Sequence, residues 1–263
     1  MKKKSLDKKT SLKKNPQHEK KDHFSFVMLA VFLILIGVFG IASFQRNAIY
    51  QNHVTLWENI VKRSPEKRRA HENYGQALSS AGQYQKALQE FRTVVALPDD
   101  GTVPPRDLYR EIGVVYYRLD QYDEAVKAWE TGLHHDPYDP SLLNNLSIVM
   151  VQLQRFDEAA LYAEKALSVA PGMPQALNTM GQISMIRREY EKAVHYFSRA
   201  LDQEPDVAQR YWNVALAFEK TRQYDKASHY AQRYVAMEQD PVSRQRGRSY
   251  LEYLTKLRSN KKG

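Results

Sequence analysis

The feature that most constrains this chain is a residue pattern that recurs every 34 residues between Arg68 and Pro241. A small residue returns at intervals of 38, 34, 34 and 34 residues, an aromatic residue follows nine positions later, and an alanine follows twelve positions later. A fixed period of this length predicts a stacked array of similar structural units. The small positions are Gly75, Gly113, Ser147, Gly181 and Ala215; the aromatic ones are Tyr84, Tyr122, Phe156, Tyr190 and Tyr224; the alanines are Ala87, Ala125, Ala159, Ala193 and Ala227.

Each unit reads as a helix, a short turn and a second helix. The small residues and the alanines would let helix backbones approach closely, and large side chains at Phe91, Trp129 and Phe197 would fill the space between neighbouring units. The second helices are expected to stop near Asp99, Pro137, Pro171 and Pro205, because proline cannot continue a helix interior. No unit could bury its apolar face alone, so the sequence predicts an all-α stack with one continuous core.

The pattern resembles the tetratricopeptide repeat family. The resemblance implies a right-handed α-solenoid whose first helices line a concave groove that holds an extended peptide or a helix of a partner protein. Five units are expected, at 68–101, 106–139, 140–173, 174–207 and 208–241. Residues 45–67 are predicted as a linker and a capping half-repeat, with a lone helix over 52–63 and an ordinary linker helix as the alternative. Residues 242–263 are predicted as a C-terminal capping helix and a basic tail.

The groove positions implied by the resemblance form the predicted partner-binding site. Asn144 and Asn178 are equivalent in consecutive units and are expected to hydrogen-bond to a bound backbone. An apolar strip beside them is typical of a binding surface. The alternative is that the C-terminal helix or self-association covers part of this strip. The predicted site comprises Arg110, Tyr117, Asn144, Ile148, Val151, Asn178, Gln182, Met185, Trp212 and Leu216.

A second feature is the uncharged run Phe24–Phe44. As a helix it would span about 31 Å, the thickness of a bilayer's hydrocarbon core, so it is expected to be a single transmembrane helix that precedes the solenoid. A cleaved signal peptide is the alternative. Residues 1–23 carry nine lysines against three acidic residues and are expected to be a disordered cytoplasmic tail. The positive-inside rule then predicts an inner-membrane protein with its repeats on the periplasmic side.

The sequence contains no pattern that indicates catalysis. It has no cysteine, no glycine-rich phosphate loop and no Gly-x-Ser-x-Gly motif. His134 and His135 are adjacent on a helix and do not face one another, so a metal site there is not expected. The net charge of +9 comes from the two basic ends, which leaves the repeats slightly acidic and gives no reason to expect nucleic-acid binding. The chain is therefore expected to be no enzyme and to need no cofactor or metal.

Three functions are consistent with this sequence. The leading one is a membrane-anchored scaffold that assembles a cell-envelope complex for secretion, pilus or polysaccharide export. The second is a periplasmic chaperone-like factor near the translocon, and the third is a regulatory module of a membrane glycosyltransferase-type enzyme. The sequence leaves the partner, the pathway and self-association open.

Overall fold

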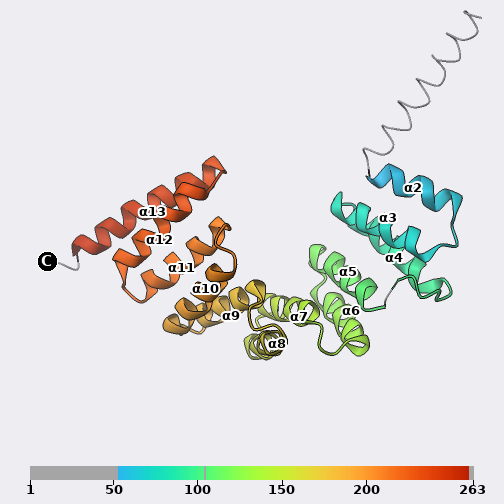
Figure 1. Ribbon diagram of the computed structural model, residues 1–263, viewed down its shortest axis with the longest axis horizontal. Helices are drawn as coiled ribbons and strands as arrows, with labels where there is room; N and C mark the ends of the chain where they lie inside the picture. The colour runs from blue at the N-terminus through green and yellow to red at the C-terminus, as the bar shows by residue number, and fades with distance from the viewer. Residues whose placement is uncertain (1–52, 104, 261–263) are drawn as a thin grey trace, which may run out of the picture. The chain divides into compact units, whose positions relative to one another are not determined.

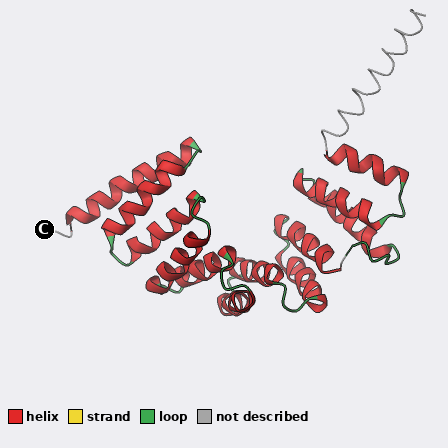
Figure 2. Cartoon of the chain, in the orientation of Figure 1, coloured by secondary structure: helices red, strands yellow, loops and turns green. Residues whose placement is uncertain are grey.

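The computed structural model describes residues 53–103 and 105–260, and all secondary structure in these residues is helical (Figures 1 and 2). The chain divides into two compact units, Met1–Arg63 and Ser64–Gly263. In the first, the described helix is α2 (His53–Arg63). The second contains α3 (Arg68–Ser80), α4 (Tyr84–Ala96), α5 (Pro105–Arg118), α6 (Tyr122–His135), α7 (Pro140–Gln152), α8 (Phe156–Val169), α9 (Pro174–Ile186), α10 (Tyr190–Gln203), α11 (Ala208–Lys220), α12 (Tyr224–Met237) and α13 (Pro241–Asn260).

The helices of the second unit form a solenoid of helix pairs. Helices α3 and α4, α5 and α6, α7 and α8, α9 and α10, and α11 and α12 pack as antiparallel neighbours, and each second helix also contacts the first helix of the next pair. Each pair falls within one of the five repeats predicted from the sequence, except that α5 begins one residue before the predicted start of the second repeat. The expected stops are confirmed, because α6, α8 and α10 end two residues before Pro137, Pro171 and Pro205.

Every first helix ends in the same turn. The backbone N–H of Gln83 donates to the carbonyl of Leu78 at 2.8 Å, and the equivalent bond recurs in the other four repeats, as in Arg155 to Met150 at 2.8 Å. This is a Schellman motif, which places the preceding residue in the left-handed conformation. That residue is a glycine in the first repeat alone, Gly82. The later repeats use Asp120, Gln154, Arg188 and Arg222.

The glycines of the period accept large rings from the second helix of their own repeat. A Cβ atom added to Gly75 would lie 2.6 Å from the Phe91 ring, and one added to Gly113 would lie 2.3 Å from the Trp129 ring. Trp129 also shares a core with Leu142 and Leu146 of the following repeat. The prediction that these rings fill the space between units is confirmed for Trp129 and for Phe197, which shares a core with Val214 of the following repeat. The structure adds that each ring packs on a glycine within its own unit.

The last helix, α13, packs against α12 as a terminal cover of the array. Gly247 makes this contact close, because a Cβ there would lie 2.6 Å from the Val235 side chain. Leu254 is fully buried, whereas Val242 and Tyr253 are exposed. One apolar face therefore joins the core while the rest of the helix is solvated, as expected for a capping helix.

The predicted membrane localisation needs correction. Within residues 53–103 and 105–260, the structure contains no helix that is both long enough and apolar enough to cross a membrane. This finding contradicts the prediction of a single-pass inner-membrane protein with periplasmic repeats. The run Phe24–Phe44 and the tail 1–23, on which that prediction depended, lie outside the described residues.

Candidate binding surface

Three first helices and one second helix together enclose a cavity of about 420 Å³, here called the first-helix cavity. Four predicted site residues meet in its wall, Val151, Gln182, Met185 and Leu216. The remaining lining residues are Ile186, Phe197 and Asn213. Gln182 is exposed, and the Ile186 side chain is 45% exposed, so the cavity opens to solvent at α9. The structure thus brings part of the predicted site together in one concave apolar feature, which is the usual form of a ligand pocket.

The local sequence explains why this cavity is apolar. Helices α7 and α9 contain no charged residue over their full lengths, although one face of each borders solvent. Gly181 on α9 lets the Phe197 ring come forward, because a Cβ there would lie 2.5 Å from that ring. Phe197 is buried and forms the floor of the cavity.

The two predicted asparagines join neighbouring first helices. Asn144 on α7 is 4% exposed, and its side-chain oxygen accepts a hydrogen bond from the Thr179 hydroxyl on α9 at 3.4 Å. The Asn178 oxygen on α9 accepts one from the Asn213 amide on α11 at 2.6 Å. Both bonds connect positions 35 residues apart. The oxygen of each asparagine is thus used within the array, a bond that sequence reasoning missed because the partner is offset from the 34-residue period by one position. Their contact with a bound backbone stays a prediction.

Trp212 is partly covered by the C-terminal helix. Its ring centroid lies 4.9 Å from that of Tyr250 on α13 and 4.9 Å from that of Tyr234 on α12. The Tyr250 hydroxyl donates to the Glu219 carboxylate at 2.9 Å. Burial, together with that carboxylate, raises the pKa of Tyr250 far above its ordinary value. The alternative considered from the sequence, that the terminal helix covers part of the apolar strip, thus holds for Trp212.

The other predicted residues lie outside the cavity wall. Tyr117 packs within an aromatic group, with ring centroids 5.5 Å from Tyr122 and 6.2 Å from Trp129. Arg110 forms an ion pair with Asp107 at 2.8 Å. Ile148 is half-buried on α7. These three residues are on the first helices, as predicted, and their contact with a partner stays a prediction.

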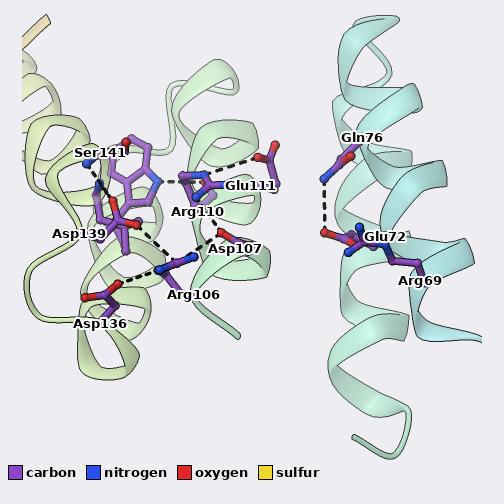
Figure 3. Close-up of polar contacts among 12 residues, drawn as sticks. Arg69, Glu72, Gln76, Arg106, Asp107, Arg110, Glu111, Asp136, Asp139 and Ser141 are labelled. Atoms are coloured by element: carbon purple, nitrogen blue, oxygen red, sulfur yellow. Dashed lines mark hydrogen bonds and ion pairs between the residues drawn. The ribbon is translucent and has the colours of Figure 1, made fainter. Parts of the chain in front are cut away.

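Helices α3 and α5 carry the charged part of the first-helix face (Figure 3). Glu72 is buried and accepts from Arg69 at 3.1 Å, and burial raises its pKa despite that cation. Glu111 has its pKa raised by burial, against the lowering effect of Arg110, and the Glu72 charge raises it further. Two carboxylates that repel one another thus lie on adjacent first helices, in contrast to the uncharged α7 and α9.

The junction of the second and third repeats is held by a polar cluster (Figure 3). Arg106 donates to Asp136 at 2.8 Å and lies 3.4 Å from Asp139. The Asp139 carboxylate also caps α7 by accepting from the backbone N–H groups of Ser141 and Leu142 at 2.8 and 2.9 Å. The cap and the ion pairs fix where α7 begins, and with it the start of the uncharged part of the face.

A comparison with known protein families identifies this pattern of helix pairs with repeated small and aromatic positions. The tetratricopeptide repeat model matches residues 54–101, 110–174 and 181–243, which is more than half of the chain. The chain belongs to the tetratricopeptide repeat (TPR) family. The first match begins at residue 54, inside α2. The capping half-repeat expected within residues 45–67 stays a prediction.

Solved TPR structures share the fold at low identity. The TPR protein YrrB, described as having an unusual peptide-binding site, is 19% identical over 73% of this chain and 97% of its own, with a TM-score of 0.52. PilF of Pseudomonas aeruginosa is 18% identical over 73% and 86%, with a TM-score of 0.62. MamA of Desulfovibrio magneticus is 18% identical over 66% and 97%, with a TM-score of 0.56. No curated protein matches the chain in sequence.

A further cavity, of about 340 Å³, lies at the first TPR junction and is here called the junction cavity. It is bordered by Leu88 and Val95 of α4, Tyr109 and Ile112 of α5, and Ala128 of α6, among others. The connection at this junction is also longer than the next one, since residues 97–104 separate α4 from α5 whereas 136–139 separate α6 from α7. The added length was recognised from the sequence, but the cavity was not.

The described TPR residues contain no group of three or more potential metal ligands. His134 and His135 are both exposed, and the His135 ring stacks on Tyr109 with centroids 6.3 Å apart. This stacking gives His135 a packing contact at the end of α6.

Proposed function

We propose that this protein is an interaction scaffold that binds a segment of a partner protein on its first-helix face. The observation that carries the proposal is the first-helix cavity, which is open, apolar and built from three successive first helices. Exposed apolar surface of this kind is unfavourable in water, and covering it with a partner lowers the free energy. The description of YrrB as a TPR protein with a peptide-binding site supports the same use of the fold.

The proposal assigns no chemical step to the chain. The carboxylates that burial perturbs, Glu72 and Glu111, lie beside arginines on α3 and α5, and neither lines the first-helix cavity. The setting in a cell-envelope complex expected from the sequence depended on the membrane segment and is not part of the proposal.

The test is site-specific photo-crosslinking with the full-length chain in its native host. One probe replaces Gln182, which is exposed at the cavity, and the matched control probe replaces Leu161, which is 50% exposed on the second helix α8. We expect protein adducts from position 182 that are absent from position 161. A single dominant adduct supports a dedicated scaffold, whereas a broad set of unfolded proteins supports the chaperone-like alternative. Equal adducts at both positions, or none at position 182, would overturn the proposal.

A further inference from the structure

The first-helix cavity offers little hydrogen-bonding capacity to a ligand. Its polar lining residues are Gln182 and Asn213. Asn213 is partly used within the array, because its oxygen accepts from Gln209 at 3.0 Å and its nitrogen donates to Asn178 at 2.6 Å. The exposed Gln182 amide, with the second N–H and the second oxygen lone pair of Asn213, is left to meet polar groups of an occupant.

An extended peptide is poorly suited to such a surface. An extended strand directs backbone N–H and C=O groups sideways along its whole length, and buried backbone groups require partners. A span across three neighbouring helices, each about 9 Å from the next, would take roughly six extended residues. These two amide side chains cannot satisfy all the peptide N–H and C=O groups that such a segment would bury against aliphatic side chains.

A helix meets the same surface without this cost, since its backbone groups are satisfied internally. It would present side chains alone to Val151, Met185, Ile186 and Leu216. The unbranched Met185 can adapt to the shape of an apolar partner. The absence of charge on α7 and α9 means that a charged side chain on the contacting face would be desolvated without an ion-pair partner there.

We infer that the occupant of the first-helix cavity is the uncharged, apolar face of an α-helix, and not an extended peptide. The inference rests on the proposed function and specifies its ligand. The partner segment has apolar residues at positions i, i+3 or i+4, and i+7, and it keeps charged residues off the face that meets α9.

The inference is tested with two peptide display libraries selected on the full-length protein. In the first library, peptides of about 16 residues on an alanine- and glutamine-rich helical scaffold have their face positions randomised over apolar and charged residues. The second has the same randomised positions but a proline at every fourth scaffold position, which prevents a helix. Ligands are then measured against the Ile186→Glu variant, and Leu161→Glu on α8 serves as the matched control because both wild-type side chains are about half exposed.

We expect ligands from the helical library alone, with apolar residues at helical spacing. Their affinity should fall about tenfold or more with Ile186→Glu, and likewise when a central ligand residue becomes proline, while Leu161→Glu leaves it unchanged. Ligands from the proline library, or ligands with charges on the contacting face, that still depend on Ile186 would overturn the inference and leave the proposed function standing. If no ligand depends on Ile186, both fail.

Discussion

At the scale of single residues, each repeat has two positions, sixteen residues apart, whose side-chain volumes compensate each other. Where the first is glycine, as at Gly75, Gly113 and Gly181, the second is a large ring, Phe91, Trp129 or Phe197. Where the first is Ser147 or Ala215, the second is Ala163 or Ala231, and all four are fully buried. Close-packed interiors tolerate changes that keep the total volume constant. The pair is therefore one packing unit shared by the two helices of a repeat.

A double-mutant cycle tests this coupling. Gly75→Leu should cost about 3 kcal/mol, because any Cβ already meets the Phe91 ring and that ring is fully buried. In a Phe91→Ala background the same leucine fills the vacated space, so its cost should fall by about 2 kcal/mol or become a gain. Urea unfolding of the four proteins measures the coupling. Gly172→Leu, in a turn where a Cβ meets the Gln203 side chain, is the control, expected within about 0.5 kcal/mol. Additive costs would contradict the pairing.

The left-handed turn residues give a second prediction at this scale. Gly82 has φ of 74° with open space around it, and Gln154 has φ of 59° at the equivalent place. Because side chains with a Cβ are strained there, Gln154→Gly should stabilise the protein by about 0.5–1 kcal/mol and Gly82→Ala should destabilise it by about 1 kcal/mol. Thermal unfolding measures both. Destabilisation by Gln154→Gly together with stabilisation by Gly82→Ala would show that chain entropy outweighs strain in these turns.

At the scale of elements, helices differ in what their polar groups do for the array. Helices α3 and α5 hold Glu72 and Glu111, whose pKa values burial raises. Helices α7, α9 and α11 are joined by amide and hydroxyl bonds without charge, through Asn144 and Asn178. Stability should therefore depend on pH at α3 and α5, whereas α7 and α9 carry no titratable side chain.

The pH dependence has a definite sign. A carboxyl whose pKa is higher in the folded than in the unfolded chain stabilises folding below its unfolded pKa and loses that contribution as pH rises through the folded pKa. At neutral pH, Glu72 therefore carries a penalty, which burial imposes and the Asp107 charge increases, while Arg69 and Arg110 reduce it. Glu72→Gln should raise the melting temperature at pH 7, and the difference from wild type should vanish as pH falls below the ordinary range of glutamate. A melting temperature lowered by Glu72→Gln at pH 7 would show that the ion pair with Arg69 outweighs burial.

The terminal helix gives a prediction at the element scale. Leu254→Ala on α13 should cost about 2–4 kcal/mol, because Leu254 is fully buried in the last core cluster. Since α13 also places Tyr250 against Trp212, loosening it should shift Trp212 fluorescence to longer wavelength. Val242→Ala on the same helix is the control, since Val242 is 72% exposed. Unchanged fluorescence after Leu254→Ala would show that Trp212 is not covered through α13.

Residue types that repeat with the period were predictable from the sequence, and contacts that depart from it were not. Gly181 and Pro205 fix a close approach and a helix end by their own backbone chemistry, so their roles follow from the sequence. The bond from Asn178 to Asn213 depends on how one first helix is rotated against the next, which no residue type encodes locally. The cover of Trp212 by Tyr250 likewise depends on the path of α13 after the repeats end. The apolar strip was therefore predicted, but the hydrogen-bonding of its asparagines was not.

At the scale of the whole solenoid, stability is a sum of repeat and junction contributions, so a weak junction sets where the array opens. The first described junction differs from the later ones in its connection, because residues 97–104 connect α4 to α5 and are twice the length of the later connections. The junction cavity of about 340 Å³ lies at this junction, among α4, α5 and α6. An unfilled space at a contact forfeits dispersion energy between its walls. Helices α3 and α4 should accordingly open at a lower free energy than α7 to α10.

Filling the junction cavity tests this view. Ala128 lines the cavity from α6, and Ala128→Met would place a flexible apolar side chain in it without a strong loss of helix propensity. We expect about 0.5–1 kcal/mol of added stability. Slower amide hydrogen exchange should appear in α3 and α4 and not in α9 or α10, because a junction contribution acts on the repeats it joins. Ala236→Met, exposed on α12, is the matched control and should leave α3 and α4 unchanged. A uniform change of exchange through all repeats would show that the solenoid opens as one cooperative unit and not from its first junction.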